Sequence, residues 1–222
     1  MRRLRISLVF NLLILFLTIV ASIIMFTGFK FMNGPETTLE STKLGMLRFF
    51  TVESNMFMGI SSLIFSITEL QLLNKKINEI PIQAYIIKLM STASVALTFL
   101  VVFTYLGPIT EYGLPAMLMN SNLFFHLIIP VLSIFTFIVF ERTDKLNLKH
   151  TIYGILPTIL YALYYLINVL IHMENGRVSP KYDWYWFVQN GVWTAVIVAP
   201  MILLITYFIS LILWRCNKKT SA

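Results

Sequence analysis

Six long apolar runs, separated by short polar segments, dominate the sequence of 222 residues. Each run is close to the roughly 20 residues that an α-helix needs to cross the hydrocarbon core of a bilayer. The runs lack the strict alternation of strands in a transmembrane barrel. The pattern therefore predicts an all-α polytopic membrane protein, a single domain over residues 1–222 with six transmembrane helices. The expected spans are residues 6–29, 49–73, 84–106, 121–140, 151–173 and 192–214.

The composition supports this class. Hydrophobic residues make up 58% of the chain and charged residues 12%, against about 45–50% and about 25% in an ordinary soluble domain. These figures exclude a soluble enzyme, a nucleic-acid-binding domain and a disordered chain. The single cysteine, Cys216, excludes an intrachain disulfide and a cysteine-based metal site. The first run is longer than the apolar core of a signal peptide, so we expect it to remain as a helix.

The net charge is +7, and the positions of the basic residues along the predicted topology indicate the orientation of the chain in the membrane. Five of them fall on one side of the membrane: Lys30, Lys43, Arg48, Arg177 and Lys181. The other twelve fall on the side of the two termini: Arg2, Arg3, Arg5, Lys75, Lys76, Lys88, Arg142, Lys145, Lys149, Arg215, Lys218 and Lys219. This bias predicts cytoplasmic termini, in a bacterial cell membrane, and explains the basic charge without a nucleic-acid partner. We expect the charged residues to lie at the membrane boundaries, where they set the orientation of the chain. Any reaction would then use neutral side chains inside the spans.

Polar residues inside three spans recur at helical spacing and so share one face of each helix. The stripe in the second span is Thr51, Asn55, Met58, Ser62 and Ser66. That in the fourth span is Asn122, His126, Pro130 and Ser133, and that in the fifth is Tyr161, Tyr165, Asn168 and His172. At about 1.5 Å per residue, several of these residues lie near the outer boundary of the membrane. If the three faces meet, they form a polar pocket in the outer half of the bundle.

Each of these residues also has a purely structural interpretation. A threonine in a transmembrane helix commonly bonds the carbonyl one turn back, and a buried asparagine commonly joins helices. His126 could be a packed residue bonded to Asn122. The fifth loop contains Tyr182, Trp184, Tyr185, Trp186 and Phe187. These aromatics fit an interfacial belt or a cover over an outward pocket.

Two short patches resemble a known family. RFFTVESNM opens the second span, and NLFFHLIIP opens the fourth. With six spans and both termini inside, this pairing resembles the bacterial integral membrane proteins related to the androgen-induced and androgen-dependent TFPI-regulating proteins. The eukaryotic members are intramembrane threonine hydrolases that cleave fatty acid esters of hydroxy fatty acids. The resemblance implies that Thr51 is the nucleophile and His126 its partner, and that the ligands are membrane lipids and a lipid ester.

Our mechanistic hypothesis is that His126 takes the proton of Thr51 as its oxygen attacks an ester carbonyl. Asn122 could orient the imidazole ring, and Asn55, Tyr165 and Asn168 could bind the oxyanion; we also expect His172 near the substrate. We predict no cofactor and no metal ion. Two other interpretations stay open. One is a membrane carrier or a lipid- or solute-binding protein with an outward polar pocket, and the other is an assembly partner without chemistry. The sequence does not indicate an oligomeric state.

Overall fold

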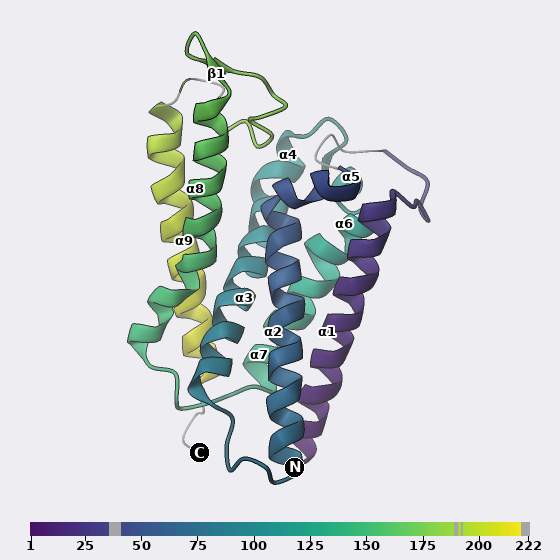
Figure 1. The fold of residues 1–222 in the computed structure, drawn as a ribbon, viewed down its shortest axis with the longest axis vertical. Coiled ribbons are helices and arrows are strands. Elements are labelled where there is room, and N and C mark those ends of the chain that lie inside the picture. Colours follow the sequence, from purple (N-terminus) through teal and green to yellow (C-terminus); the bar gives the residue numbers. More distant parts are fainter. Residues whose placement is uncertain (36–40, 189–190, 192, 219–222) are drawn as a thin grey trace.

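The computed structural model describes residues 1–35, 41–188, 191 and 193–218. Six of its helical segments are long and apolar enough to cross a membrane, which confirms the predicted all-α bundle (Figure 1). The predicted span boundaries are close to the observed ones; the largest difference is in the first span, which begins at Arg2 rather than at residue 6. The spans are Arg2–Thr27, Phe50–Leu73, Ile82–Ile109, Ser121–Val139, Leu148–Ile171 and Trp193–Asn217.

The first three spans are nearly continuous helices. The first is α1 (Arg2–Thr27), and a 3₁₀-helix, η1 (Lys43–Arg48), precedes the second, α2 (Phe50–Leu73). The third combines α3 (Ile82–Val101), a π-helical segment, η2 (Val102–Leu106), and α4 (Gly107–Ile109).

The fourth and fifth spans are less regular, and the sixth is a single α-helix. A short helix, α5 (Gly113–Met117), leads to the fourth span, which consists of α6 (Ser121–Leu123), a π-helical segment η3 (Phe124–Ile128) and α7 (Ile129–Val139). The fifth span begins as a 3₁₀-helix, η4 (Leu148–Ile155), and continues as α8 (Leu156–Ile171). A two-stranded antiparallel hairpin, β1 (Met173–Glu174) and β2 (Arg177–Val178), then leads toward α9 (Trp193–Asn217).

The two π-helical segments each lie just before a proline. Proline has no N–H to donate, and its ring clashes with the carbonyl four residues earlier. For Pro130 that carbonyl belongs to His126, and for Pro108 it belongs to Thr104. A wider π turn relieves this conflict, and π turns occur frequently at functional sites. His126 therefore lies in a locally widened helix.

The helix α3 lies at the centre of the bundle, in contact with α2, α7, α8 and α9. In the third span 61% of the most apolar stretch of 18 residues is buried inside the protein. The corresponding shares are only 22% in the fifth span and 17% in the sixth. On the other side, α1 packs closely on α2, because a Cβ atom at Gly59 would come within 2.9 Å of the Thr18 side chain. The helices α1, α2, α3 and α7 therefore pack closely on one another, whereas most of the surface of α8 and α9 is not covered by other parts of the protein.

The start of α1 and the end of α9 lie at one end of the bundle, which we call the terminal end, and the β1–β2 hairpin, α4 and α5 lie at the opposite end (Figure 1). Side chains from α1 and α9 bond there to the backbone at and after the end of α7. Arg3 Nε donates to the Phe140 carbonyl at 3.0 Å. The side-chain amide of Asn217 donates to the carbonyls of Phe137 at 2.6 Å and Glu141 at 2.9 Å.

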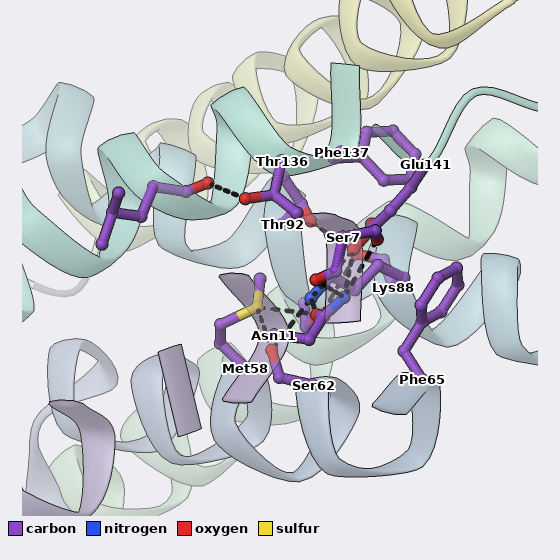
Figure 2. A network of polar contacts seen from close by, with 12 residues as sticks. Ser7, Asn11, Met58, Ser62, Phe65, Lys88, Thr92, Thr136, Phe137 and Glu141 are labelled. Atoms are coloured by element: carbon purple, nitrogen blue, oxygen red, sulfur yellow. Dashed lines mark hydrogen bonds and ion pairs between the residues drawn. The ribbon is translucent and has the colours of Figure 1, made fainter. Parts of the chain in front are cut away.

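The core of the terminal end contains charged side chains. Lys88 on α3 and Glu141 after α7 form an ion pair at 3.6 Å, and both side chains are fully buried. Asn11 on α1 donates to Glu141 at 2.8 Å, and Lys88 donates to Ser62 on α2 at 2.9 Å, so the polar groups of four spans converge (Figure 2). Lys88 was expected to be a boundary charge that serves topology, and this expectation is wrong. Its ammonium finds its partners inside the protein.

Candidate active site

Thr51 lies in the first turn of α2, toward the opposite end of the bundle, and is half-buried. It borders two cavities at once, a small one toward the fourth span and a large one toward the fifth and sixth. The residue before the helix, Phe49, is extended, and this turns the chain sharply into α2. The start of α2 therefore places the Thr51 side chain at the junction between the two cavities.

The small cavity joins the polar stripes of the second and fourth spans. Its polar lining consists of Thr51, Asn122, His126 and Tyr185, and its apolar lining includes Met117 and Phe49. Its volume of about 10 Å³ is close to the ~10–15 Å³ that one water molecule requires on this scale. The sequence left open whether the two stripes meet. In the structure they do, in a space that accommodates a single water molecule beside the hydroxyl and the imidazole.

The imidazole of His126 is held in one orientation by the backbone of the preceding loop. Its Nδ1 lies 2.5 Å from the carbonyl oxygen of Met117 in α5. A carbonyl oxygen can only accept a hydrogen bond, so Nδ1 carries the proton in this contact and Nε2 of the neutral ring carries the lone pair. The residue is almost fully buried, with 4% of its surface exposed. The structure therefore presents an oriented ring with one nitrogen able to accept a proton.

The large cavity lies between α3, α8 and α9 and has a volume of about 560 Å³. This size falls within the usual range of ligand pockets, about 300–1,000 Å³. Most of its lining is aliphatic, with residues such as Leu97, Val101, Leu166 and Ala199. Polar or aromatic groups border it mainly near Thr51. The polar pocket expected from the three stripes is therefore a small polar cavity beside a much larger apolar one.

The aromatic loop before α9 covers the start of α2. Trp184 and Tyr185 are buried there, with 5% and 7% of their surfaces exposed. The phenol oxygen of Tyr185 accepts a hydrogen bond from the Phe50 N–H at 3.0 Å, and it also lies within hydrogen-bonding reach of Thr51. Burial raises the pKa of Tyr185 to about 12. Of the two interpretations of the loop aromatics, these two residues fit the cover over a pocket.

Asp183 fixes this loop to α8. Its carboxylate accepts a hydrogen bond from the hydroxyl of Tyr165, and it accepts the backbone N–H groups of Phe187 at 3.0 Å and Val188 at 3.2 Å. Trp184 in turn donates from its indole N–H to the Tyr161 hydroxyl at 3.0 Å. The side chains on α8 therefore hold the cover in place above Thr51.

The other residues predicted for the site have partners of their own. Both hydrogen bonds that Asn55 donates go to backbone carbonyls, those of Thr51 at 2.7 Å and Phe125 at 3.0 Å. Asn168 donates to the Tyr182 carbonyl at 2.8 Å, and the ring of His172 stacks on Tyr182 with centroids 3.6 Å apart. Asn55 thus joins the second and fourth spans, and Asn168 and His172 fasten the loop. None of the three residues lines either cavity.

Three residues predicted as oxyanion donors are already engaged in this arrangement. The amide of Asn55, the hydroxyl of Tyr165 and the amide of Asn168 all donate to other groups of the protein. The hydroxyl of Tyr185 and the Phe50 N–H in the first turn of α2 also lie beside Thr51, and they are bonded to each other. Among the described residues, no group of three histidine, cysteine, aspartate or glutamate side chains is arranged to hold a metal ion.

Sequence reasoning did not assign roles to Tyr185 and Met117. Tyr185 appeared as one of several loop aromatics, and nothing in its sequence neighbourhood distinguishes it from them. Met117 acts through its carbonyl, which any residue at that position would supply. The signal that could have indicated Met117 is the half-apolar third loop, whose length allows it to fold back against the fourth span.

In comparisons with known proteins, no family model, no curated protein and no solved structure matches the chain.

Proposed function

We propose that this integral membrane protein hydrolyses lipid esters, with Thr51 as the nucleophile and His126 as the base. One observation carries the proposal. Thr51 borders both a large apolar cavity, suited to an acyl chain, and a small cavity shared with His126, suited to a water molecule. An ester hydrolase needs this combination, because its substrate is apolar and its second substrate is water.

The reaction runs in two steps on these groups. In the first, His126 Nε2 takes the proton of Thr51 Oγ1 as this oxygen attacks the ester carbonyl, and the imidazolium then protonates the departing alkoxide. An alcohol leaves and an acyl-threonine remains. In the second step a water molecule gives a proton to His126 and attacks the acyl carbon. The bond between the acyl carbon and Thr51 Oγ1 then breaks, the imidazolium of His126 returns its proton to Oγ1, and the fatty acid leaves.

The negative charge of the tetrahedral intermediate needs hydrogen-bond donors. The hydroxyl of Tyr185 and the backbone N–H groups at the start of α2 lie beside Thr51, and the Phe50 N–H, which donates to Tyr185 in the free protein, would have to turn to the oxyanion. The positive end of the α2 dipole points to the same place and favours an anion there. Proposed oxyanion stabilisation therefore rests on the start of α2 and on Tyr185.

The substrate class follows from the resemblance of the two sequence patches to the intramembrane threonine hydrolases, together with the shape of the large cavity. We infer a fatty acid ester of a hydroxy fatty acid, drawn from membrane lipids. The basic residues favour cytoplasmic termini in a bacterial cell membrane, which puts Thr51 on the outer side. Water and lipid can both approach a site at that depth.

A fluorophosphonate probe on the purified protein tests the proposal directly. We expect labelling of the wild type, loss of labelling in Thr51→Ala, and hydrolysis slower by roughly 10²–10⁴-fold in His126→Gln, the usual contribution of a general base. Thr104→Ala is a matched control, since Thr104 is an exposed helical threonine bonded to the Leu100 carbonyl. Full ester hydrolysis in both Thr51→Ala and His126→Gln would contradict the mechanism.

The large cavity also supports a second function, a carrier or lipid-binding protein that carries out no chemistry. The same apolar lining would hold an acyl chain, and the hydroxyl end would hold its head group. Binding of a fluorescent fatty acid by wild-type and Thr51→Ala proteins, with neither hydrolysis nor probe labelling in the wild type, would favour this function over the hydrolase.

A further inference from the structure

A second polar centre occupies the terminal end of the bundle, far along α2 from Thr51. It contains two carboxyl groups, Glu69 and Glu141, and one ammonium group, Lys88, all fully buried. Glu69 is on α2, Lys88 is on α3, and Glu141 lies two residues after α7 ends. We call these three residues the charged cluster. An ionised group without a partner in such a place is costly, so the charge of the cluster must be accounted for.

The charges of the cluster do not balance if all three groups are ionised. Two carboxylates and one ammonium leave one negative charge within the protein. Two like charges in one buried site also disfavour each other's ionisation. The charge is balanced by one additional proton on a carboxyl group. The contacts then indicate which of the two carboxyl groups carries it.

Glu141 has the contacts of a carboxylate. It forms the ion pair with Lys88 at 3.6 Å and accepts the Asn11 amide at 2.8 Å, on the same oxygen, Oε1. Figure 2 shows Asn11, Lys88 and Glu141 pointing toward one another from three different segments. Glu69 receives the same Asn11 amide at only 3.4 Å and, among the described residues, forms no ion pair with Lys88.

The unused oxygens suggest how the proton is shared. Among the described residues, Oε1 of Glu69 and Oε2 of Glu141 are buried atoms without a hydrogen-bond partner. Asn11 Nδ2 contacts both carboxyl groups, so the two groups are neighbours. A proton on Glu69 Oε1 supplies a donor, and Glu141 Oε2 is a neighbouring acceptor that lacks a partner. Carboxyl pairs that share one proton are well known in proteins.

We propose that the charged cluster is a binding site for one exchangeable proton, carried by Glu69 and shared with Glu141. Exchange takes place with water at the terminal end, because Glu141 is already part of the loop after α7. This site does not depend on the hydrolase function, since its residues line neither cavity near Thr51.

The groups around Glu69 set the conditions of the exchange. Lys88 and Tyr85 face it from α3, Glu141 faces it from the end of α7, and Arg3 on α1 is close to Tyr85. The hydroxyl of Ser7 on α1 also bonds the Glu69 carboxyl. Only Lys88 among these lies at the centre of the cluster with a positive charge. Loss of the proton from Glu69 leaves this single cation between two carboxylates.

Infrared difference spectroscopy of the full-length protein in detergent micelles tests the proposal. We expect the wild type to show the carbonyl stretch of a protonated carboxylic acid at neutral pH, and to lose it when the pH is raised. Glu69→Gln should abolish this band. Glu53→Gln should keep it, because Glu53 is an exposed carboxyl group on the same helix. The absence of the band in the wild type, or its persistence in Glu69→Gln, would overturn the proposal.

Thermal unfolding supplies a second measurement. Glutamine imitates a protonated glutamate, so Glu69→Gln should keep the Tm that the wild type has at about pH 4, near the pKa of a free carboxyl group. It should weaken the fall of the Tm as the pH rises from there toward neutrality, because over that range the unfolded chain has lost the proton that the folded protein keeps. Glu141→Gln removes the partner of Lys88 and should lower the Tm. The reverse ranking would place the proton on Glu141 and overturn its assignment to Glu69. The spectrum of the wild type decides the existence of the proton even if one variant fails to fold.

Discussion

The two ends of the bundle use polar side chains in different ways. At the terminal end buried ionisable groups contact one another across different segments: Lys88 pairs with Glu141, and Asn11 contacts both Glu69 and Glu141. At the opposite end Thr51 and His126, both neutral, border a cavity. Groups bonded mainly to one another contribute to the fold, whereas groups that line a cavity can contact a ligand.

This difference also follows the packing of the helices. The charged end lies where α1, α2, α3 and α7 pack tightly, and the large cavity lies where α3 meets the less buried α8 and α9. Substitutions at the two ends should therefore have different effects. Those at the charged cluster should change the free energy of unfolding, and those around Thr51 should change the handling of lipid. The following predictions are ordered by the expected change in stability.

The largest effect is expected for Lys88→Met. It leaves Glu141 buried without its cation, and breaking a buried ion pair in this way usually costs about 3–5 kcal/mol. Denaturant unfolding in mixed micelles measures the change. Lys145→Met is the control, because Lys145 pairs with the exposed Glu79 at 2.9 Å and an exposed pair contributes about 0–1 kcal/mol. Equal losses in both variants would remove the distinction between the two ends.

Asp183→Ala should have the next largest effect. It leaves the N–H groups of Phe187 and Val188 and the hydroxyl of Tyr165 without their acceptor. Unsatisfied buried groups cost about 1–3 kcal/mol each, partly recovered if the loop opens to water. We also expect the loop over Thr51 to become sensitive to proteolysis. Asp144→Ala, at an exposed position in another loop, should change neither quantity.

Tyr185→Phe should cost about 1 kcal/mol, because the Phe50 N–H loses its acceptor. The same variant should change the response to alkali. The pKa of Tyr185 is raised from 10.0 to about 12 by burial, so the unfolded chain loses this proton first. The stability that Tyr185 contributes is complete below pH 10 and falls as the pH rises toward 12.

Unfolding curves measured across this pH range should show a shallower decline in Tyr185→Phe than in the wild type. Tyr164→Phe removes the hydroxyl of an exposed tyrosine and should leave the decline unchanged. A decline of the same steepness in all three proteins would mean that Tyr185 is not titrating as a buried group.

We expect the smallest effect on stability for Ala199→Trp, together with a large effect on the binding of lipid. Ala199 lines the large cavity from α9, so the indole fills empty space with little strain. Binding of a long-chain fatty acid should weaken by roughly tenfold or more, the equivalent of about 1.4 kcal/mol. Ile212→Trp, on the exposed surface of the same helix, should bind normally. Unchanged binding in Ala199→Trp would place the acyl chain elsewhere.

Much of the fold was predictable, because the constraint that a bilayer places on a chain is simple. Apolar length predicts the spans, and helical spacing predicts their buried faces. Asn55, Met58, Ser62 and Ser66 are all buried on α2. Face and depth placed Thr51 and His126 at a similar level of the membrane but left open whether their spans meet; the shared small cavity is a finding of the structure. These predictions rest on periodicity, which each helix carries in its own sequence.

The remaining features depend on contacts between helices. Lys88 and Glu69 lie near the ends of their spans, where a charge normally reaches water, so their burial depends on Asn11 and Glu141 far away in the sequence. The orientation of His126 depends on a backbone carbonyl, and the large cavity depends on how α8 and α9 lean against α3. Such features have no periodic signal of their own.

The π turn that carries His126 amounts to one additional residue in the fourth span. An α-helix advances by 3.6 residues per turn, so one residue corresponds to a rotation of about 100°. Deleting a single residue between Phe124 and Ile128 would let the span close into regular α-helix. Everything on the loop side of the deletion would then rotate by that angle relative to α7. The number of residues in the fourth span therefore sets the direction of the His126 side chain, together with the contacts of the ring. Homologous chains with a shorter fourth span should not conserve the histidine.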